Sequence, residues 1–231
     1  MLFKADLDLI GEVTLMPLIL TGRERGSPSA ATDAGQSERR SSASMVKILE
    51  GALRLVGNRG VTRLTMRDIC TAAHVSRATL YRHFSTKEEV LDAVTEYICV
   101  NFEIGVMAAA DEHADPIERF RAVMTFFSRY ARDRSPEPML ELEPGFYLAF
   151  FRSHFTRHKI AVTNALARSF DYFEERLGTS LNRVGIAEAL IRMQLSTLMV
   201  PAESDWIALW DKSPEIVVRL LDMHVAGAQA R

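Results

Sequence analysis

The sequence predicts an all-α protein. Apolar residues recur at helical spacing from about residue 45 to the C-terminus, whereas no stretch of useful length alternates polar and apolar residues as a half-buried strand does. The 231 residues are 48% hydrophobic and 25% charged, which suffices for a sizeable core in one or two domains. No apolar run approaches the roughly 18 to 20 residues of a membrane helix, so we expect no membrane partner.

Two cysteines, Cys70 and Cys99, lie within helical apolar patterns. Two thiols in a chain of this length do not make the disulfide framework that small secreted domains need in place of a large core. The sequence therefore favours a reducing, cytoplasmic compartment.

Positive charge is concentrated in one segment. Residues 39–87 contain ten lysines and arginines and only two carboxylates, a net charge of +8, in a chain whose total is −2. The remainder therefore carries −10. A basic part joined to an acidic part is typical of a polyanion-binding module attached to a regulatory or oligomerisation body. A solvated basic face on an ordinary helical domain is the alternative.

Residues 1–44 differ in composition from the rest. The stretch 7–20 is apolar but interrupted by two carboxylates and a proline, so it fits neither a signal peptide nor a membrane span, and a short hairpin, a short helix or no fold all stay open. Residues 21–44 are too poor in large apolar side chains to offset the entropy of ordering and are predicted to be a flexible arm. Helical periodicity begins at Met45, which leaves open that translation starts there.

Turn and cap residues divide the basic segment into short helices. Ser, Thr and Asp at a helix start accept hydrogen bonds from its exposed amides, and Asn or Gly at a helix end adopts the left-handed conformation that closes it. Together with apolar periodicity, these signals predict four helices: one from residue 44 ended by Asn58 and Gly60, one from Thr65 to about Ala73, one from Ser76 through His83, and one opened by Ser85 or Thr86.

The second half is also predicted to be helical, with proline and glycine marking its breaks. The expected elements are a helix around residues 117–131, a loop from Asp133 to Pro138, a break at Pro144 and Gly145, two helices between residues 146 and 177 whose division stays open, a helix from Asn182 to Val200, and one from Ser213 to about Gln229.

The segment from Met66 to Phe84 has the pattern of a helix-turn-helix. Two short helices that meet across a tight turn need a small residue where their backbones approach and apolar anchors on each helix. In such a unit the second helix is free to lie in a major groove while flanking groups hold phosphates. The sequence offers Cys70 as the small residue, residues 73–75 as the turn, and anchors at Ile69, Val75 and Leu80.

These residues resemble the DNA-binding region of the TetR-type transcriptional repressors. The resemblance covers about residues 48–92 and rests on the combined patterns T-x-x-D-I from Thr65, V-S-x-x-T-L-Y-x-x-F from Val75 and K-E-E-V-L from Lys87. It implies a homodimeric repressor of a palindromic operator. The implied organisation is a flexible extension at 1–44, a helix-turn-helix DNA-binding domain at 45–92, and a helical effector-binding and dimerisation domain at 93–231.

The resemblance also implies which residues contact DNA. Groups at helix N-termini, where amides favour an anion, are expected to bind phosphates. Outward side chains of the second helix of the motif are expected to read base edges, with Arg77 suited to guanine O6 and N7. Phosphate contacts are assigned to Thr65, Tyr81 and Lys87 and groove contacts to Arg77, Thr79 and His83, with Ser76 at the start of the same helix and Arg82 reaching the backbone or lying in solvent.

Several features of this segment leave alternatives open. Tyr81 and Phe84 also suit a core position between the third and fourth helices. His74 occupies a turn position where the family usually has glycine, which leaves the angle between the two helices of the motif open. Gly57 occupies a position where alanine is common. The arginine pair 39–40 suits either a minor-groove contact or a basic tail.

Two helices of the second half are candidates for a dimer interface. A two-fold DNA-binding dimer holds its reading helices about one duplex turn apart, or a multiple. Apolar stripes on the helices from Asn182 and Ser213 suit a four-helix interface between copies, although they would equally close the core of one copy. The stripes contain Ile186, Ala189, Leu190, Met193, Thr197, Val217, Leu220, Leu221 and His224.

Aromatic side chains are concentrated in the middle of the chain. The resemblance implies that the central helices surround a small-molecule site, and such a lining suits an apolar or aromatic effector; aromatic residues at helical spacing also serve as plain core. The predicted ligand-binding residues are Phe126, Phe127, Tyr130, Phe146, Phe150, Phe151 and His154, with Arg152 and Arg157 as further polar candidates.

No enzyme signature is found: nothing resembles a nucleophile elbow, a Walker loop or a dinucleotide fingerprint, and neither a cofactor nor a metal is predicted. His154 and His158 are spaced to share a metal ion, but the sequence identifies no third ligand. We therefore expect a regulator and not an enzyme. The alternatives are a metal-dependent helical-bundle enzyme and a DNA-binding module without an effector.

Overall fold

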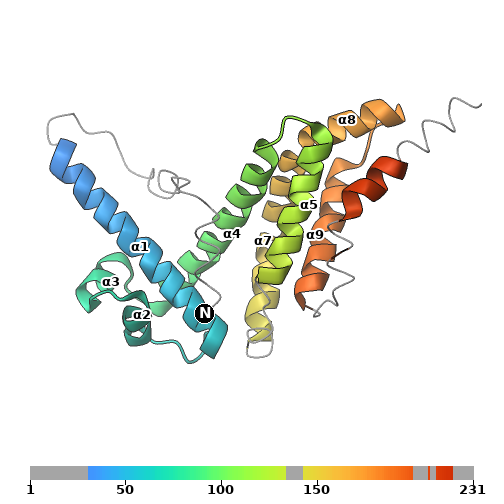
Figure 1. Cartoon of the computed structure of the whole chain (residues 1–231). Helices are drawn as coiled ribbons and strands as arrows, with labels where there is room; N and C mark the ends of the chain where they lie inside the picture. The colour runs from blue at the N-terminus through green and yellow to red at the C-terminus, as the bar shows by residue number, and fades with distance from the viewer. Residues whose placement is uncertain (1–30, 134–142, 200–207, 209–211, 221–231) are drawn as a thin grey trace, which may run out of the picture. The chain divides into compact units, whose positions relative to one another are not determined.

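The computed structural model describes residues 31–133, 143–199, 208 and 212–220, and every regular element within them is an α-helix (Figure 1). The all-α prediction is therefore confirmed. The chain divides into two compact units, residues 1–97 and 98–231. This division and the boundary at residue 92 expected from the sequence both fall inside one helix, α4 (Lys87–Asp111). Predictions for the stretch 7–20, the loop after Asp133 and the chain beyond residue 220 concern residues outside these ranges.

The first unit is built from α1 (Ala31–Arg59), α2 (Met66–Ala73), α3 (Arg77–His83) and the start of α4. Both short helices pack on α1, as Figure 1 shows. Their apolar side chains form one core with those of α1 and α4, because each helix carries apolar residues on the face that it turns inward. The buried residues of this core include Ile48, Ala52, Val56, Ile69, Leu80, Val90 and Val94.

α1 begins at Ala31, well before the onset of apolar periodicity. The prediction of a flexible arm is therefore wrong for residues 31–44. No apolar stripe marks this segment, and so periodicity could not reveal it. Its alanine, glutamate, glutamine and arginine residues favour helix, and a helix extends readily once a packed turn exists, because nucleation is the unfavourable step.

α1 and α2 approach closely at Gly51. A Cβ atom at this position would lie 2.8 Å from the amide nitrogen of Ala73 and 2.9 Å from its Cα atom, so the backbone of α2 leaves no room for a side chain. One turn later, Arg54 donates from Nη2 to the carbonyl of Ala72 over 2.8 Å. Cys70, expected to be the small residue of the motif, is buried with a free thiol, but the sequence pattern gave no sign of the contact at Gly51.

The turn of the motif has the predicted caps. Thr65 accepts a hydrogen bond from the amide of Asp68 over 3.2 Å at the start of α2, and Ser76 accepts one from the amide of Thr79 over 3.0 Å at the start of α3. His74 closes α2 with φ 53° and ψ 41°. It is the one non-glycine residue with positive φ in the described ranges. The turn thus keeps the left-handed backbone that glycine adopts freely, at a modest conformational cost for histidine.

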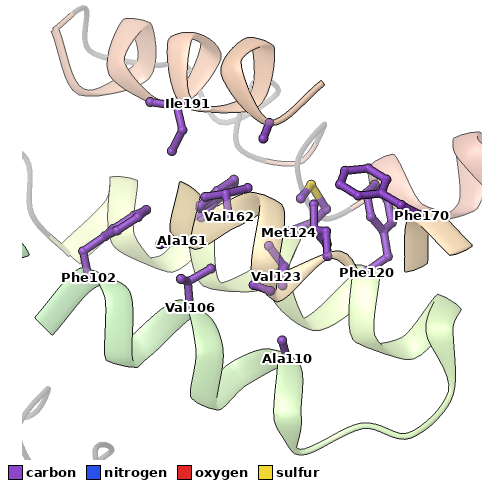
Figure 2. Close-up of a cluster of buried hydrophobic side chains, with 14 of the residues drawn as sticks. Phe102, Val106, Ala110, Phe120, Val123, Met124, Ala161, Val162, Phe170 and Ile191 are labelled. Atoms are coloured by element: carbon purple, nitrogen blue, oxygen red, sulfur yellow. The ribbon is translucent and has the colours of Figure 1, made fainter. Parts of the chain in front are cut away.

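The second unit contains the rest of α4, then α5 (Pro116–Asp133), α7 (Pro144–Ala165), α8 (Ala167–Leu177), α9 (Arg183–Met199) and a helical stretch at 212–220. The division that the sequence left open falls at Leu166. α9 packs on α5 and α7, and α8 packs on the same two helices. Figure 2 shows their common core, which includes Phe102, Val106, Ala110, Phe120, Val123, Met124, Ala161, Val162, Phe170 and Ile191.

A buried arginine joins three helices of the second unit. Arg119, on α5, is 4% exposed. Its Nε donates to the carbonyl of Ala165 at the end of α7 over 2.7 Å, and its Nη1 to the carbonyl of Ala110 near the end of α4 over 3.0 Å. Nη2 pairs with Asp111 at 2.7 Å. A buried guanidinium needs such partners for its donors, and here they fix the ends of α4 and α7 against α5.

Of the described helices, α4 alone is long and apolar enough to meet the composition criterion for crossing a bilayer. Several of its apolar residues are buried within the protein. Val90 and Val94 are buried in the first unit, and Phe102 and Val106 are buried in the second. A helix that contributes to two cores is apolar over more of its surface than one that contributes to a single core.

Candidate nucleic-acid interface and effector site

The outer face of α3 carries cationic and aromatic side chains. Leu80 is fully buried and Phe84, directly after the helix, is 7% exposed, so these two side chains anchor α3 in the core. This confirms the core alternative for Phe84. Tyr81, in contrast, is 55% exposed, and both Arg77 and Arg82 are exposed. A short helix with one anchored side and an open side bearing Arg and Tyr has the form of a DNA-reading helix.

The N-terminus of α3 is held by a pair of hydroxyls. Ser76 accepts from the Thr79 amide, and the two side-chain oxygens lie 2.8 Å apart. Ser76 is exposed and Thr79 is half-buried. The hydroxyl of Ser76 therefore caps α3, and the hydroxyl of Thr79 lies within hydrogen-bonding distance of it.

At the helix N-termini where phosphate contacts are predicted, backbone amides already donate hydrogen bonds to capping side chains. The amide of Asp68 donates to Thr65, and at the start of α4 the amide of Glu89 donates to Thr86 over 3.2 Å. The carboxylate of Glu89 in turn accepts from the amide of Ser85, the residue before Thr86, over 2.6 Å. The attraction of Lys87 for a phosphate thus depends on its ammonium charge more than on exposed amides.

His83, predicted to face the groove, is half-buried. Its Nε2 is buried without a partner among the described residues. Burial and the charge of Arg82 lower the pKa of His83. In this conformation Nε2 lies below the surface, and the groove contact of His83 stays a prediction.

Most cations of the basic segment lie at the surface. Arg54 is an exception, because it donates to the carbonyl of Ala72 and so belongs to the α1–α2 contact. Lys87 is half-buried. The exposed cations are Arg40, Lys47, Arg59, Arg63, Arg67, Arg77 and Arg82. They supply the charge that phosphate binding needs.

The second unit brings the predicted aromatic residues into two ring clusters. In one, Phe126 and Tyr130 are half-buried and Phe127 is fully buried; in the other, Phe150 packs on Phe151 and His154 with centroids 5.3 and 5.1 Å apart. Phe127 therefore packs in the core. Phe146, also predicted, is half-buried at the start of α7 against Tyr147.

Phe102 and His158 connect these clusters. The Phe102 centroid lies 5.7 Å from Phe126, 5.5 Å from Tyr130 and 4.6 Å from His158. His158 lies 6.2 Å from Phe150. Phe102 comes from α4 and His158 from α7, and neither was among the predicted ligand-binding residues. The helical spacing of Phe102 with Val94 and Ile98 already placed it on an apolar face, but nothing in the sequence paired it with His158.

Polar groups in this region differ in whether they have a hydrogen-bond or ion-pair partner among the described residues. Arg157 pairs with Glu103. His158 is 7% exposed, and its Nε2 has no hydrogen-bond partner among the described residues. Burial, with the charges of His154 and Arg157, lowers the pKa of His158 to about 4. The described residues contain no group of three or more His, Cys, Asp or Glu side chains placed to hold a metal ion, so the His154–His158 pair gains no third ligand there.

The apolar stripes predicted for a dimer divide between core and surface. Ile186, Leu190 and Val217 pack against the core of the second unit, whereas Ala189 and Met193 are exposed. The exposed large apolar residues on α9 and in residues 212–220 are Val184, Met193, Ile216 and Leu220. The side chain of Thr197, and Leu221 and His224, lie outside the described part of the chain.

Comparison with known proteins finds similarity to one family. Residues 48–94 match the family model described as bacterial regulatory proteins, tetR family. The nucleoid occlusion factor SlmA of Vibrio cholerae serotype O1 is 32% identical over 82 residues, 36% of this chain and 41% of that protein. The crystal structure of apo AibR is similar with a TM-score of 0.51 and 25% identity, over 75% of this chain and 97% of AibR. Residues 48–94 are thus similar to the TetR family, and the fold over 75% of the chain is similar to that of AibR.

Sequence similarity to the curated relatives covers only part of the chain. An HTH-type transcriptional regulator of Mycobacterium tuberculosis is 32% identical over 97 residues, 42% of this chain and 48% of its own length. The chain thus spans less than half the length of these two curated relatives. The likeness to AibR extends further and includes the helical body.

Proposed function

We propose that this chain is a ligand-responsive transcriptional repressor of the TetR family that binds operator DNA as a cytoplasmic homodimer and catalyses no reaction. Residues 45–92 bind DNA, residues 93–231 bind the effector and form the dimer, and residues 1–44 are an N-terminal extension. The observation that carries the proposal is the open face of α3, where Arg77 and Tyr81 are exposed while Leu80 is buried. A helix capped at its start and anchored on one side presents those side chains rigidly.

Recognition of the operator combines specific and general contacts. In this proposal Arg77 pairs with guanine O6 and N7, a contact that contributes roughly 1–3 kcal/mol of discrimination. The hydroxyl of Tyr81 and the ammonium of Lys87 bind phosphates and fix the register of α3 in the groove. The exposed cations of the first unit add sequence-independent attraction, which falls as salt rises.

The homodimer is proposed on the exposed apolar residues of the second unit. Val184 and Met193 on α9, with Ile216 and Leu220 in the helical stretch 212–220, are large apolar side chains at the surface. A second copy that covers them would remove apolar area from water. It would also hold two copies of α3 at a fixed spacing, as a palindromic operator requires.

The effector acts in this proposal through α4. This helix starts in the DNA-binding unit and carries Phe102 in the ring clusters of the second unit. A ligand that inserts beside Phe102 favours a different placement of α4, and hence a spacing of the two α3 helices that no longer fits successive grooves. The effect is a population shift whose size is set by the difference in ligand affinity between the two states.

Selection of bound fragments from random DNA by the full-length protein tests the proposal. We expect an enriched palindrome, and fluorescence anisotropy should show affinity for it that falls steeply between 50 and 200 mM salt, conditions over which phosphate-dependent binding weakens by about 10³–10⁵. Arg77→Ala should lower discrimination at one base pair per half-site, whereas Arg168→Ala, an exposed arginine on α8, should not. Failure to enrich any sequence would overturn the proposal.

A further inference from the structure

Two buried side chains of the second unit have polar atoms without partners. They are His158 on α7, 7% exposed, and Gln194 on α9, 3% exposed. Nε2 of His158 and both side-chain polar atoms of Gln194 make no hydrogen bond within the described part of the chain. Most buried polar groups in proteins are hydrogen-bonded, and leaving one unpaired is destabilising. Three such atoms in one small core therefore call for an explanation.

Both side chains lie in the same part of the second unit. α7 and α9 run antiparallel, because Lys159 pairs with Glu188 over 3.2 Å while Phe155 lies 4.8 Å from the guanidinium of Arg192. Continuing this register places Gln194 level with the turn of α7 that carries Phe150 and His154, about 7 Å along the axis from His158 at 1.5 Å per residue. Gln194 follows Ile191 on the buried face of α9.

The surroundings of His158 are aromatic. Its ring lies 4.6 Å from Phe102 and 6.2 Å from Phe150, centroid to centroid. Phe102 also makes an edge contact with Tyr130 at 5.5 Å. Sites of this kind, apolar walls with a few converging polar groups, are typical of small-molecule sites.

Several charged side chains near His158 are paired with one another. Arg157 is bound to Glu103, and Glu188 is bound by Lys159 and Arg192. A charged ligand that takes one of these groups as its counter-ion would have to break a pair, whereas an uncharged ligand would not. The unpaired amide of Gln194 offers both a donor and an acceptor.

We propose that His158 and Gln194 are the polar recognition groups of the effector site, and that the effector is an uncharged, elongated aromatic or apolar molecule with hydrogen-bonding groups at two points offset by about 7 Å along the axis of α7. The inference rests on the proposed function, since it supplies the chemistry of the effector. It goes beyond the aromatic lining by naming the two groups that orient the ligand.

Three rigid probes of equal core size test this inference. They are naphthalene, 2,6-dihydroxynaphthalene and naphthalene-2,6-dicarboxylate, titrated into the full-length protein and followed by their own fluorescence. The dihydroxy compound should bind at least tenfold more tightly than naphthalene, and the dicarboxylate should bind more weakly than the dihydroxy compound. Each of His158→Phe and Gln194→Met should reduce affinity for the dihydroxy compound about tenfold, the effect of losing about 1.4 kcal/mol, and leave naphthalene binding unchanged.

Controls separate binding from folding. His113→Phe repeats the substitution in the connection between α4 and α5 and should leave all three affinities unchanged. Far-UV circular dichroism and thermal unfolding should show the two site variants folded and at least as stable as the parent, because each removes unpaired buried polar atoms. In long-range ¹H–¹⁵N spectra, the ring signals that vanish in His158→Phe should shift with the dihydroxy probe and not with naphthalene.

The outcomes distinguish this inference from the proposed function. Equal binding of naphthalene and its dihydroxy derivative, tighter binding of the dicarboxylate, or unchanged affinities in both folded variants would overturn the inference. If the same preparations still bind the selected operator in anisotropy titrations, the proposed function stands without it. Probe binding as expected, with no sequence-specific DNA binding by the parent protein, would support the site and overturn the regulator proposal.

Discussion

Adding one methyl group at two nearby glycines of α1 should have opposite effects on stability. In Gly51→Ala, the new Cβ would lie 2.8 and 2.9 Å from the amide nitrogen and Cα of Ala73 and 3.0 Å from the carbonyl carbon of Ala72. These are main-chain atoms, which cannot rotate away. In Gly57→Ala, no atom outside the adjoining backbone of α1 lies within 4 Å of the new Cβ. The pair therefore separates the steric effect from the effect of helix propensity.

The two magnitudes follow from this geometry. Alanine is favoured over glycine in a helix interior by about 0.8–1 kcal/mol, so Gly57→Ala, near the end of α1, should raise the free energy of unfolding by about 0.5 kcal/mol. At Gly51 the same gain is opposed by overpacking, which typically costs about 1–3 kcal/mol. Since α2 must move to relieve the contact, we expect a net loss of about 1–2 kcal/mol.

Urea unfolding of the full chain, followed by far-UV circular dichroism, gives the free energies. Native-state hydrogen exchange then shows whether the loss in Gly51→Ala is confined to α1 and α2. We also expect weaker operator binding in Gly51→Ala, because a displaced α2 carries Thr65 and the turn with it. Equal or greater stability of Gly51→Ala relative to the parent would refute the close-approach argument.

Three further results are expected. Tyr81→Phe combined with Lys87→Ala should weaken anisotropy-measured binding to all DNA sequences and reduce the salt dependence; unchanged affinity would contradict the phosphate assignment. Arg119→Met should lower the free energy of unfolding by about 3 kcal/mol, because the carbonyls at the ends of α4 and α7 lose a buried donor; a loss below about 1 kcal/mol in urea melts would show that those carbonyls find other partners. Hydrogen bonding from Arg183 lowers the pKa of Glu174 to about 2 from an ordinary 4.5. The ionised Glu174 should therefore stabilise the folded state above about pH 4.5, and this contribution should be lost as the pH falls toward 2. In urea melts at several pH values, the free energy of unfolding of Glu174→Gln should lack that part of the pH dependence.

Local signals in the sequence predicted the DNA-binding unit well. Caps at Thr65 and Ser76 and the left-handed residue before the second short helix depend on neighbours within a few positions, so the sequence displays them directly. The open position of Tyr81 was left undecided, because an aromatic side chain at helical spacing suits core and surface alike. Its exposure depends on the rotation of α3 about its own axis where it packs on α1, and periodicity over seven residues does not specify that rotation.

Contacts between distant residues could not be predicted in the same way. Gly51 is excluded from having a side chain by α2, more than twenty residues away in sequence, and no local pattern marks that position. The start of α1 was not predicted because residues 31–44 are helical but lack the apolar stripe by which periodicity recognises a helix. In the second unit, the aromatic residues were recognised as a group, but the link through Phe102 and His158 arises from the packing of α4 on α7.

Because α4 is continuous across the two units, it also limits where the chain can be cut into fragments that fold by themselves. No loop separates the two units, because residues 87–111 form one hydrogen-bonded helix that crosses their boundary. A fragment ending near residue 92 would leave its last carbonyls without helical donors and discard Val94 from the core it belongs to. Proteases should therefore find no susceptible bond at the junction, and a DNA-binding fragment meant to fold by itself should extend past residue 97.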